Sequence, residues 1–251
     1  MWECPDFLDL PPRARKPRAS GVTHVLDKGV PLVTLASLLE GAGELVDVVK
    51  VGWGVGYVDP LLKNRVGLCH SAEVTVSLGG TLLELAVAQS RLAALRDWAT
   101  EQGVDALEVS NGLGAMTQAG KTAVVRELAG ELTVLAETGA KDDRVPVVPE
   151  QWAAEMAADL EAGARWVIAE GRESGTVGLY HADGSVREEL VELLAGRLPL
   201  DRVIFEAPRK AQQAWFVRHL GPDVNLGNVP VDEVLALETL RLGLRADTAA
   251  I

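Results

Sequence analysis

Four apolar runs in the middle of the chain each carry a glutamate where a polar, glycine- or proline-marked tail begins. The runs are ALEVSNG (106–112), LTVLAETGAKD (132–142), RWVIAEGRESG (165–175) and RVIFEAPRK (202–210). A short strand that buries its apolar residues and then presents an acid beside Lys or Arg brings polar groups to one edge of a sheet. Folding does not require charge to be concentrated in this way, but a site for an anionic substrate does.

These acids need positive partners. Together with Asp27, the glutamates Glu108, Glu137, Glu170 and Glu206 would repel one another strongly in a pocket of low dielectric constant. The candidate cations are a bound Mg²⁺, which prefers carboxylate and water ligands with phosphate nearby, and the side chains of Lys28, Lys50, Lys141, Arg172 and Lys210. A structural ion-pair network is the alternative for any one glutamate. For the whole set we favour a functional site over a structural network, because so much buried charge destabilises a fold and is unexpected without a functional role.

Three further segments suit anion chemistry. Lys141 can bind an anion or act as a general acid, and Arg172 suits bidentate contacts with carboxylate or phosphate. Gly227 and Asn228 precede a predicted helix, where backbone N–H groups form the usual phosphate site of a barrel. An exposed lysine, a surface salt bridge and an ordinary turn are the respective alternatives. We interpret His24 as outward-facing, and the four histidines share no metal-ligand spacing.

The elements that must position these residues alternate regularly. Eight β-rich runs occur at 22–27, 45–52, 73–80, 106–111, 132–137, 165–170, 202–207 and 223–227. Helical spacing lies between them, most clearly at 81–103, which we interpret as one helix. Such alternation predicts parallel strands, and eight units in about 250 residues predict a single (β/α)8 TIM barrel over 21–251, with its active site at the strands' C-terminal ends. An open doubly wound sheet is the alternative.

Residues 1–20 are rich in proline and arginine, and we expect a short N-terminal arm packed on the barrel. Side chains along a strand alternate between its two faces. The four glutamates therefore share an inward face with neighbours such as Leu135 and Ile168. Lys50 with Val48, and Asp27 with Val25, are assigned to the same face.

The bulk composition narrows the class of protein. A net charge of −12 argues against nucleic-acid and anionic-membrane partners. Two cysteines in 251 residues imply no disulfide framework and favour a reducing cytoplasm. No apolar run approaches the roughly 18 residues of a membrane span. We expect a cytoplasmic enzyme that forms a homo-oligomer.

An ordered set of motifs resembles the phosphosulfolactate synthase family, including its coenzyme M biosynthetic, bacterial and plant stress-associated members. The motifs are KPRASGVTHVLDKG, KVGWGVG, GGTLLE, EVSNG, ETGAKD, DLEAGA, RESG, IFEAPRKAQQ and VNLGN followed by LETLRLGLRADT, within residues 16–248. The resemblance implies a TIM-barrel lyase that uses Mg²⁺ to add sulfite to phosphoenolpyruvate, giving (2R)-phospho-3-sulfolactate.

The resemblance also implies roles for residues of this chain. Lys141 would protonate C2, with Glu137 and Glu170 as its catalytic partners, and Asp27, Glu108 and Glu206 would hold the metal. Substrate-binding roles fall to Lys28, Lys50, Asn111, Arg172, Lys210, Gly227 and Asn228.

The chain departs from the family pattern near the site. The pattern has FGWGT and EVGKKD where this sequence has VGWGVG and ETGAKD, so Ala140 replaces an expected lysine. A missing cation bears most directly on sulfite binding. Two alternatives therefore stay open: addition of another nucleophile to phosphoenolpyruvate or a similar phosphorylated acid, and a non-catalytic stress-associated homologue.

Overall fold

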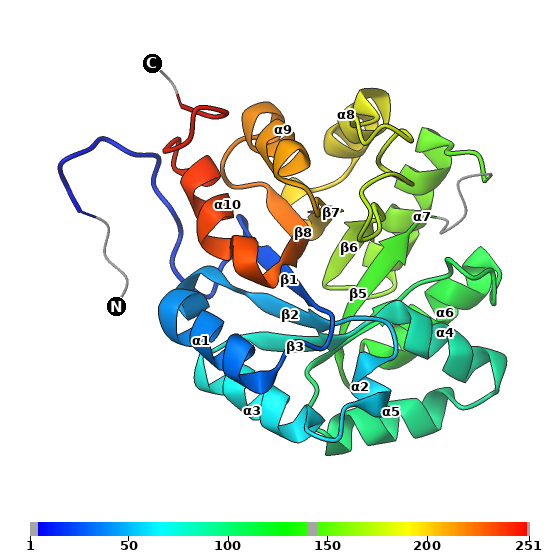
Figure 1. Ribbon diagram of the computed structural model, residues 1–251. Coiled ribbons are helices and arrows are strands. Elements are labelled where there is room, and N and C mark those ends of the chain that lie inside the picture. Colours follow the sequence, from blue (N-terminus) through cyan, green and yellow to red (C-terminus); the bar gives the residue numbers. More distant parts are fainter. Residues whose placement is uncertain (1–4, 140–144, 250–251) are drawn as a thin grey trace.

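The computed structural model describes residues 5–139 and 145–249, and these form a closed barrel of parallel strands (Figure 1). Each strand pairs with the next, and the last pairs with the first, which excludes an open sheet. The strands are β1 (Thr23–Asp27), β2 (Val48–Val51), β3 (Thr75–Leu78), β4 (Ala106–Val109), β5 (Thr133–Thr138), β6 (Trp166–Ala169), β7 (Val203–Glu206) and β8 (Asn225–Pro230). The predicted (β/α)8 barrel is therefore confirmed.

Helices surround the barrel as crossover connections. They are α1 (Leu32–Ala42), α2 (Val55–Val58), α3 (Leu62–Ser71), α4 (Gly80–Ala88), α5 (Leu92–Glu101), α6 (Gln118–Leu128), α7 (Pro149–Glu161), α8 (Glu188–Arg197), α9 (Lys210–Leu220) and α10 (Val234–Arg241), with 3₁₀ turns at Gly43–Leu45, Leu200–Arg202 and Val231–Glu233. No helix in the described part of the chain is long and apolar enough to cross a membrane.

The prediction of one helix over 81–103 is wrong. The structure has α4 and α5 there, separated by Ser90, whose φ is 56°. A positive φ cannot continue a right-handed helix. The apolar spacing continues across the break and gives no sign of it, because both helices pack on the same side of the barrel.

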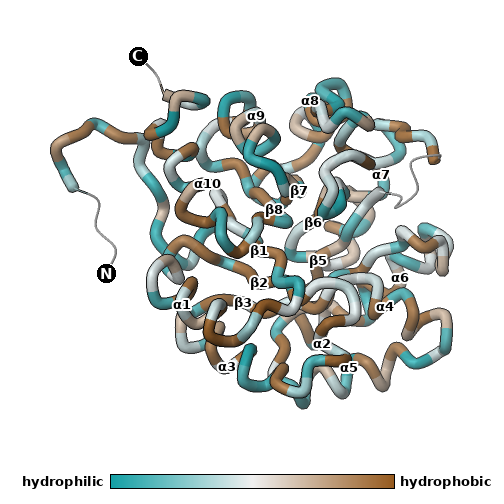
Figure 2. Tube along the Cα trace, in the orientation of Figure 1, coloured by the Kyte–Doolittle hydropathy of each residue, from teal (hydrophilic) through white to brown (hydrophobic). Residues whose placement is uncertain are grey.

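Apolar side chains fill two layers, one between strands and helices and one inside the barrel. Hydrophobic colours accordingly run along several of the strands in Figure 2. The inner layer includes Val48, Leu135 and Ile168, so the inward faces predicted for β2, β5 and β6 are confirmed. Val25 belongs to the outer layer instead. The prediction that Asp27 shares an inward face with Val25 is therefore wrong, and so is the outward assignment of His24.

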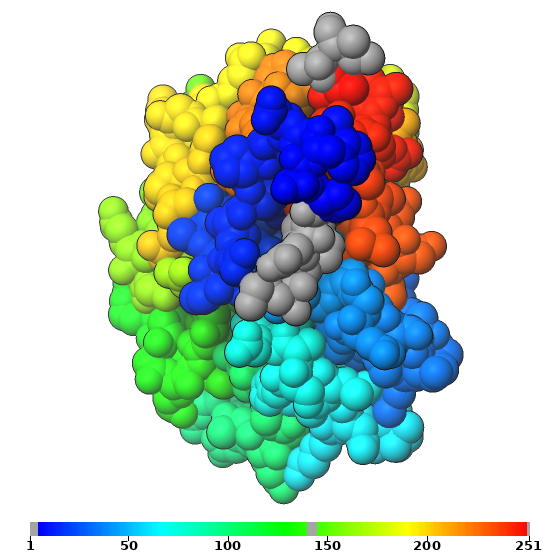
Figure 3. Space-filling view, turned by 90° about the vertical axis from the view of Figure 1, so that its left-hand side faces the viewer, coloured from blue at the N-terminus to red at the C-terminus, as the bar shows by residue number. Residues whose placement is uncertain are grey.

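The N-terminal arm lies on the surface of the barrel domain, beside the C-terminal part of the chain (Figure 3). Arg13 Nε lies 2.8 Å from Glu238 Oε1 of α10. Arg18 Nη1 lies 3.0 Å from Asp47 Oδ1, just before β2. Asp47 in turn accepts the backbone N–H of Thr23 at the start of β1. The arm is thus fastened to the strand starts, away from the strands' C-terminal ends.

Candidate active site

Lys50 of β2 is the centre of the polar cluster inside the barrel. Its ammonium Nζ lies 2.9 Å from Glu108 Oε2 and 3.0 Å from Glu206 Oε1. All three side chains are buried. Burial alone would lower the pKa of Lys50, but the charges of Glu108, Glu206 and Glu137 hold it well above its usual value. Lys50 is therefore a fixed positive charge surrounded by carboxylates from β4, β5 and β7.

Glu108 is held in its ionised form. Besides Lys50, its Oε1 accepts the backbone N–H of Gly80, the first residue of α4, at 2.9 Å. Burial would raise the pKa of Glu108, but Lys50 and this backbone donor lower it to about 2. A side chain on Gly80 would collide with Ser110, so glycine is required where the helix approaches β4.

Glu206 and Glu170 share a backbone donor in the turn after β6. The N–H of Arg172 lies 2.6 Å from Glu170 Oε1 and 2.9 Å from Glu206 Oε2, and the N–H of Gly171 also reaches Glu206 Oε2 at 2.9 Å. Arg172 adopts a φ of 56°, so the chain turns sharply at this residue. The turn therefore aligns two acids from neighbouring strands.

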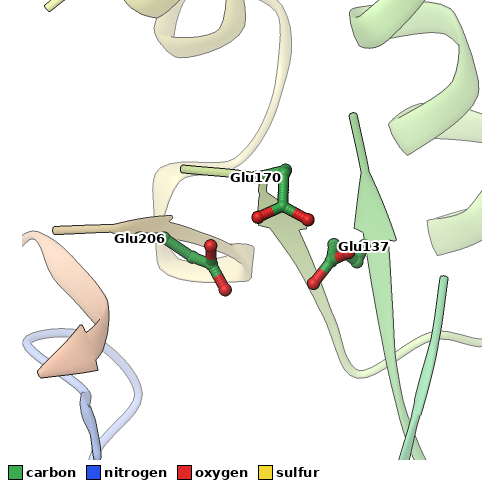
Figure 4. A group of neighbouring side chains, drawn as sticks. All are labelled: Glu137, Glu170 and Glu206. Atoms are coloured by element: carbon green, nitrogen blue, oxygen red, sulfur yellow. The ribbon is translucent and has the colours of Figure 1, made fainter. Parts of the chain in front are cut away.

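Glu137, Glu170 and Glu206 form a group in which one carboxylate oxygen from each lies within 4.8 Å of the others (Figure 4). Burial, and then repulsion from Glu137 and Glu206, raise the pKa of Glu170 well above its usual value. Its Oε2 is buried and has no hydrogen-bond partner among the described residues. Three converging oxygen donors that repel one another form a set that suits a hard divalent cation, which would replace any proton they share.

A cavity of about 240 Å³ opens above these acids. Pockets for drug-sized ligands measure about 300–1,000 Å³, so this one suits a smaller molecule. Its wall includes Asn228, a buried residue with a φ of 52° whose Oδ1 has no hydrogen-bond partner in the described chain. The full lining is Leu26, Lys50, Gly52, Trp53, Gly79, Gly80, Thr81, Glu108, Leu113, Glu137, Glu170, Arg172, Glu173, Glu206 and Asn228.

The structure brings seven of the predicted site residues to this cavity: Lys50, Glu108, Glu137, Glu170, Arg172, Glu206 and Asn228. Lys141, the predicted general acid, lies outside the described residues, as does Ala140. Their roles stay predictions.

Asp27 is not part of the cluster. Its carboxylate faces away from the barrel interior and pairs with Arg65 of α3, with 2.5 Å between Oδ2 and Nη1. Its Oδ1 accepts the backbone N–H groups of Gly29 and Val30. These contacts fix the turn between β1 and α1, so the structure gives Asp27 a structural partner and separates it from the glutamates predicted to share a metal with it.

Four predicted substrate-binding residues also lie apart from the cavity lining. Lys28 is exposed, and Lys210 starts α9 with its Nζ 2.7 Å from Asp247 Oδ2 near the C-terminus. The Asn111 side chain bonds the backbone of Met116 and shapes its own loop. Gly227 lies within β8, where a side chain would collide with Ile204, so it provides room inside the barrel. Asn111 lines a second cavity that also includes Glu137. The substrate-binding roles of these four residues stay predictions.

Two features of the site were not recognised in the sequence. His24 is fully buried inside the barrel, near Lys50 and Glu108. Glu84 of α4 is also fully buried, and it accepts bonds from the Ser110 hydroxyl and, at 2.7 Å, from the N–H of Leu113 in the cavity wall. The sequence does contain a signal for Glu84: it is an acid on the apolar face of the GGTLLE helix, and such an acid needs a buried partner.

Solved structures share the fold. A 3-hexulose-6-phosphate synthase superposes with a TM-score of 0.57 at 16% identity, covering 88% of this chain and 98% of that one. The YdjI aldolase from Escherichia coli K12 gives 0.58 at 14% identity, covering 87% and 78%. At these identities the likeness concerns the barrel alone.

Sequence comparison is more specific. A family model described as (2R)-phospho-3-sulfolactate synthase (ComA) matches residues 11–247. Phosphosulfolactate synthase from Bacillus subtilis is 39% identical over 97% of this chain and 98% of its own length, and that from Methanothermobacter thermautotrophicus is 41% identical over 97% and 96%. Protein HEAT-STRESS-ASSOCIATED 32 from Arabidopsis thaliana is 26% identical over 94% and 90%. A match of this length and strength shows that the chain belongs to the phosphosulfolactate synthase family.

Proposed function

We propose that this protein is a Mg²⁺-dependent phosphosulfolactate synthase, a lyase that forms a carbon–sulfur bond between sulfite and C3 of phosphoenolpyruvate. The observation that carries the proposal is the group of three buried carboxylates beside Lys50, in a chain that belongs to this family. The product would be (2R)-phospho-3-sulfolactate.

The charges in the cavity support a divalent cation. Four buried glutamates face one buried lysine, and Arg172 with Glu173 adds no net charge at the mouth. Phosphoenolpyruvate and sulfite are themselves anions, so they would meet strong repulsion in a pocket of low dielectric constant. A cation held by Glu137, Glu170 and Glu206 would remove this obstacle. The buried Oε2 of Glu170 offers it an oxygen that no described residue occupies.

Magnesium bound by these residues would supply positive charge where negative charge develops on the substrate carboxylate during attack at C3. The chain itself holds the reactants. Lys50 keeps Glu108 and Glu206 in place. Arg172 can bind a phosphate or carboxylate through two parallel N–H bonds. The Asn228 side chain offers a buried amide to the same ligand.

Protonation of C2 completes the reaction. Lys141 stays our prediction for the donor, since the ETGAKD motif follows β5 directly after Glu137. Attack at C3 moves an electron pair onto C2 and the carboxylate, and one proton delivered from one face restores the acid and sets its configuration.

The direct test is turnover by the purified protein. Phosphoenolpyruvate, sulfite and Mg²⁺ are incubated with the protein, and ¹³C and ³¹P NMR are used to detect phosphosulfolactate. We expect product with wild type and a loss of about 100-fold in Glu170→Gln, because the variant removes a charged ligand of the proposed metal site. Glu189→Gln, an exposed glutamate of α8, is the matched control and should retain full activity. Absence of product at saturating substrates would refute the proposal.

A nucleophile panel separates the alternatives. Sulfide, small thiols and hydroxylamine replace sulfite in the same assay. Consumption of phosphoenolpyruvate with one of these but not with sulfite would mean that the enzyme adds another nucleophile. Ala140, which replaces a lysine expected to bear on sulfite binding, motivates this alternative. No consumption with any of them would favour a non-catalytic, stress-associated role; a relative named for heat stress is 26% identical to this chain.

A further inference from the structure

His24 sits inside the barrel one inward position below the acid cluster. It is paired in register with Val48, whereas Lys50 is paired with Leu26, one inward position further along β1. Burial, and then the charge of Lys50, lower the pKa of His24 to about 3, so its imidazole is neutral. A neutral imidazole has one N–H donor and one lone-pair acceptor. Neither ring nitrogen has a hydrogen-bond partner among the described residues.

Ser77 of β3 presents a second unsatisfied group on the other side of β2. It is in register with Lys50, and residues in register on neighbouring parallel strands share a face. Ser77 is fully buried, and its Oγ has no hydrogen-bond partner in the described chain. Buried polar atoms of this kind are rare in native proteins, and an ordered water is a common explanation.

The Lys50 ammonium has one more N–H donor than the two that bond the glutamates. It carries three N–H donors, and two of them bond Glu108 and Glu206. His24 and Ser77 thus flank β2 on either side of Lys50, whose third N–H has no acceptor within residues 5–139 and 145–249.

We propose that a buried water lies beneath Lys50. It accepts a hydrogen bond from the third ammonium N–H and forms hydrogen bonds with the side chains of His24 and Ser77. A buried water needs two to four polar partners and enough room. The partners are the three side chains named, and small residues provide the room. Ala106, a small residue, is in register with Ser77. Gly227 has no side chain to occupy the space beside His24, where a Cβ would lie 3.2 Å from His24 Nδ1 and 2.8 Å from Ile204 Cγ2.

The consequence is that His24 and Ser77 are positioning residues. With all three protons bound, Lys50 is a rigid charge that orders Glu108 and Glu206, and it does not reach up to bind substrate directly. This differs from the substrate-binding role that the family resemblance implies for Lys50. The water itself is independent of the proposed function, whereas its effect on turnover rests on that function.

A crystal structure of the unliganded protein at a resolution that orders internal waters tests the site directly. We expect a density peak within about 3.2 Å of a His24 ring nitrogen, Ser77 Oγ and Lys50 Nζ. The peak should disappear or move in Ser77→Ala. An empty position in wild type would overturn the proposal whether or not the protein makes phosphosulfolactate.

Kinetics test the positioning role. Loss of the water would remove its hydrogen bond with the charged Lys50, which predicts a drop of about 10- to 100-fold in kcat/KM for His24→Leu. His24→Asn, which retains a donor and an acceptor, should recover most of it. Ile168→Val trims the same interior without touching a polar atom and is the control. Rescue by asparagine is not expected of a purely space-filling role. Wild-type kcat/KM in both His24→Leu and Ser77→Ala would refute positioning, and Ser77→Ala decides alone if the leucine variant does not fold.

Discussion

The two ends of the barrel both bury charge, but they balance it differently. At the end where the strands begin, Arg13 meets Glu238, Arg18 meets Asp47, and Arg241 donates to the backbone oxygens of Val22 and Val224. At the opposite end, four glutamates gather around Lys50. Matched pairs need no ligand. The excess of acid at the mouth is stable only with protons or a bound cation, which is why we assign binding to that end and stability to the other.

Removing the positive charge of Lys50 should have the largest effect on stability and turnover. Lys50→Met leaves Glu108 and Glu206 buried without their common partner, and breaking a buried pair in this way costs roughly 3–5 kcal/mol. We expect a matching fall in the free energy of unfolding by urea, together with loss of turnover. The double variant Lys50→Met/Glu108→Gln should recover part of the stability because it removes one of the two orphaned charges. A single variant as stable as wild type would contradict the central place given to Lys50.

At the other end, Arg13→Ala should reduce stability and leave turnover intact. The Arg13 and Glu238 side chains are each 4% exposed, so the substitution strands a buried carboxylate at a cost of about 3 kcal/mol. Urea unfolding measures the loss, and kcat of the folded protein should equal that of wild type. Arg96→Ala breaks an exposed pair and serves as control, with an expected change below about 1 kcal/mol. A fall in kcat for Arg13→Ala would mean that the two ends are coupled.

Magnesium should stabilise the folded protein by binding at the mouth of the barrel, and not at the opposite end. A ligand that binds the folded state at 100 times its Kd adds about 2.7 kcal/mol to the free energy of unfolding. Thermal melts of chelator-treated protein should therefore shift upward with added Mg²⁺ in wild type and in Arg13→Ala. Glu170→Gln should abolish the shift, whereas Glu189→Gln should keep it. An equal shift in Glu170→Gln would place the ion elsewhere.

The sequence predicted the barrel and the position of four acids because both depend on periodicity. Strand–helix alternation carried the fold, and β4 to β7 each have one clearly apolar outer face, so Glu108, Glu137, Glu170 and Glu206 could be assigned inward. The same reasoning assigned the wrong inward face to β1. Its two faces, Val22/His24/Leu26 and Thr23/Val25/Asp27, each mix apolar and polar residues, so pattern alone does not say which faces inward.

The remaining differences come from contacts between segments far apart in the chain. Lys210 follows β7 in sequence but pairs with Asp247, and Asp27 pairs with Arg65 of α3. A sequence shows which charges stand near a strand end, but their partners depend on how the connections pack. The short motifs therefore located the four glutamates correctly, misplaced Asp27, and overestimated the number of cations that join the cluster.

Titration should give the smallest effect and distinguish the two ends again. The pKa of Glu170 is raised in the folded protein, so between its usual value of about 4.3 and the folded value the native state holds the extra proton. The free energy of unfolding of metal-free protein should then fall as pH rises, by at most about 1.4 kcal/mol per pH unit for one proton.

The difference in this free energy between wild type and Glu170→Gln isolates the effect. His24, with its pKa lowered to about 3, contributes the opposite slope below about pH 6.5, but it does so in both proteins and cancels. Glu108, with a pKa of about 2, stays ionised from pH 5 to pH 8. Urea unfolding over this range should show Glu170→Gln gaining stability relative to wild type as pH rises. A pH-independent difference would mean that the metal-free mouth carries its excess charge without holding a proton at Glu170.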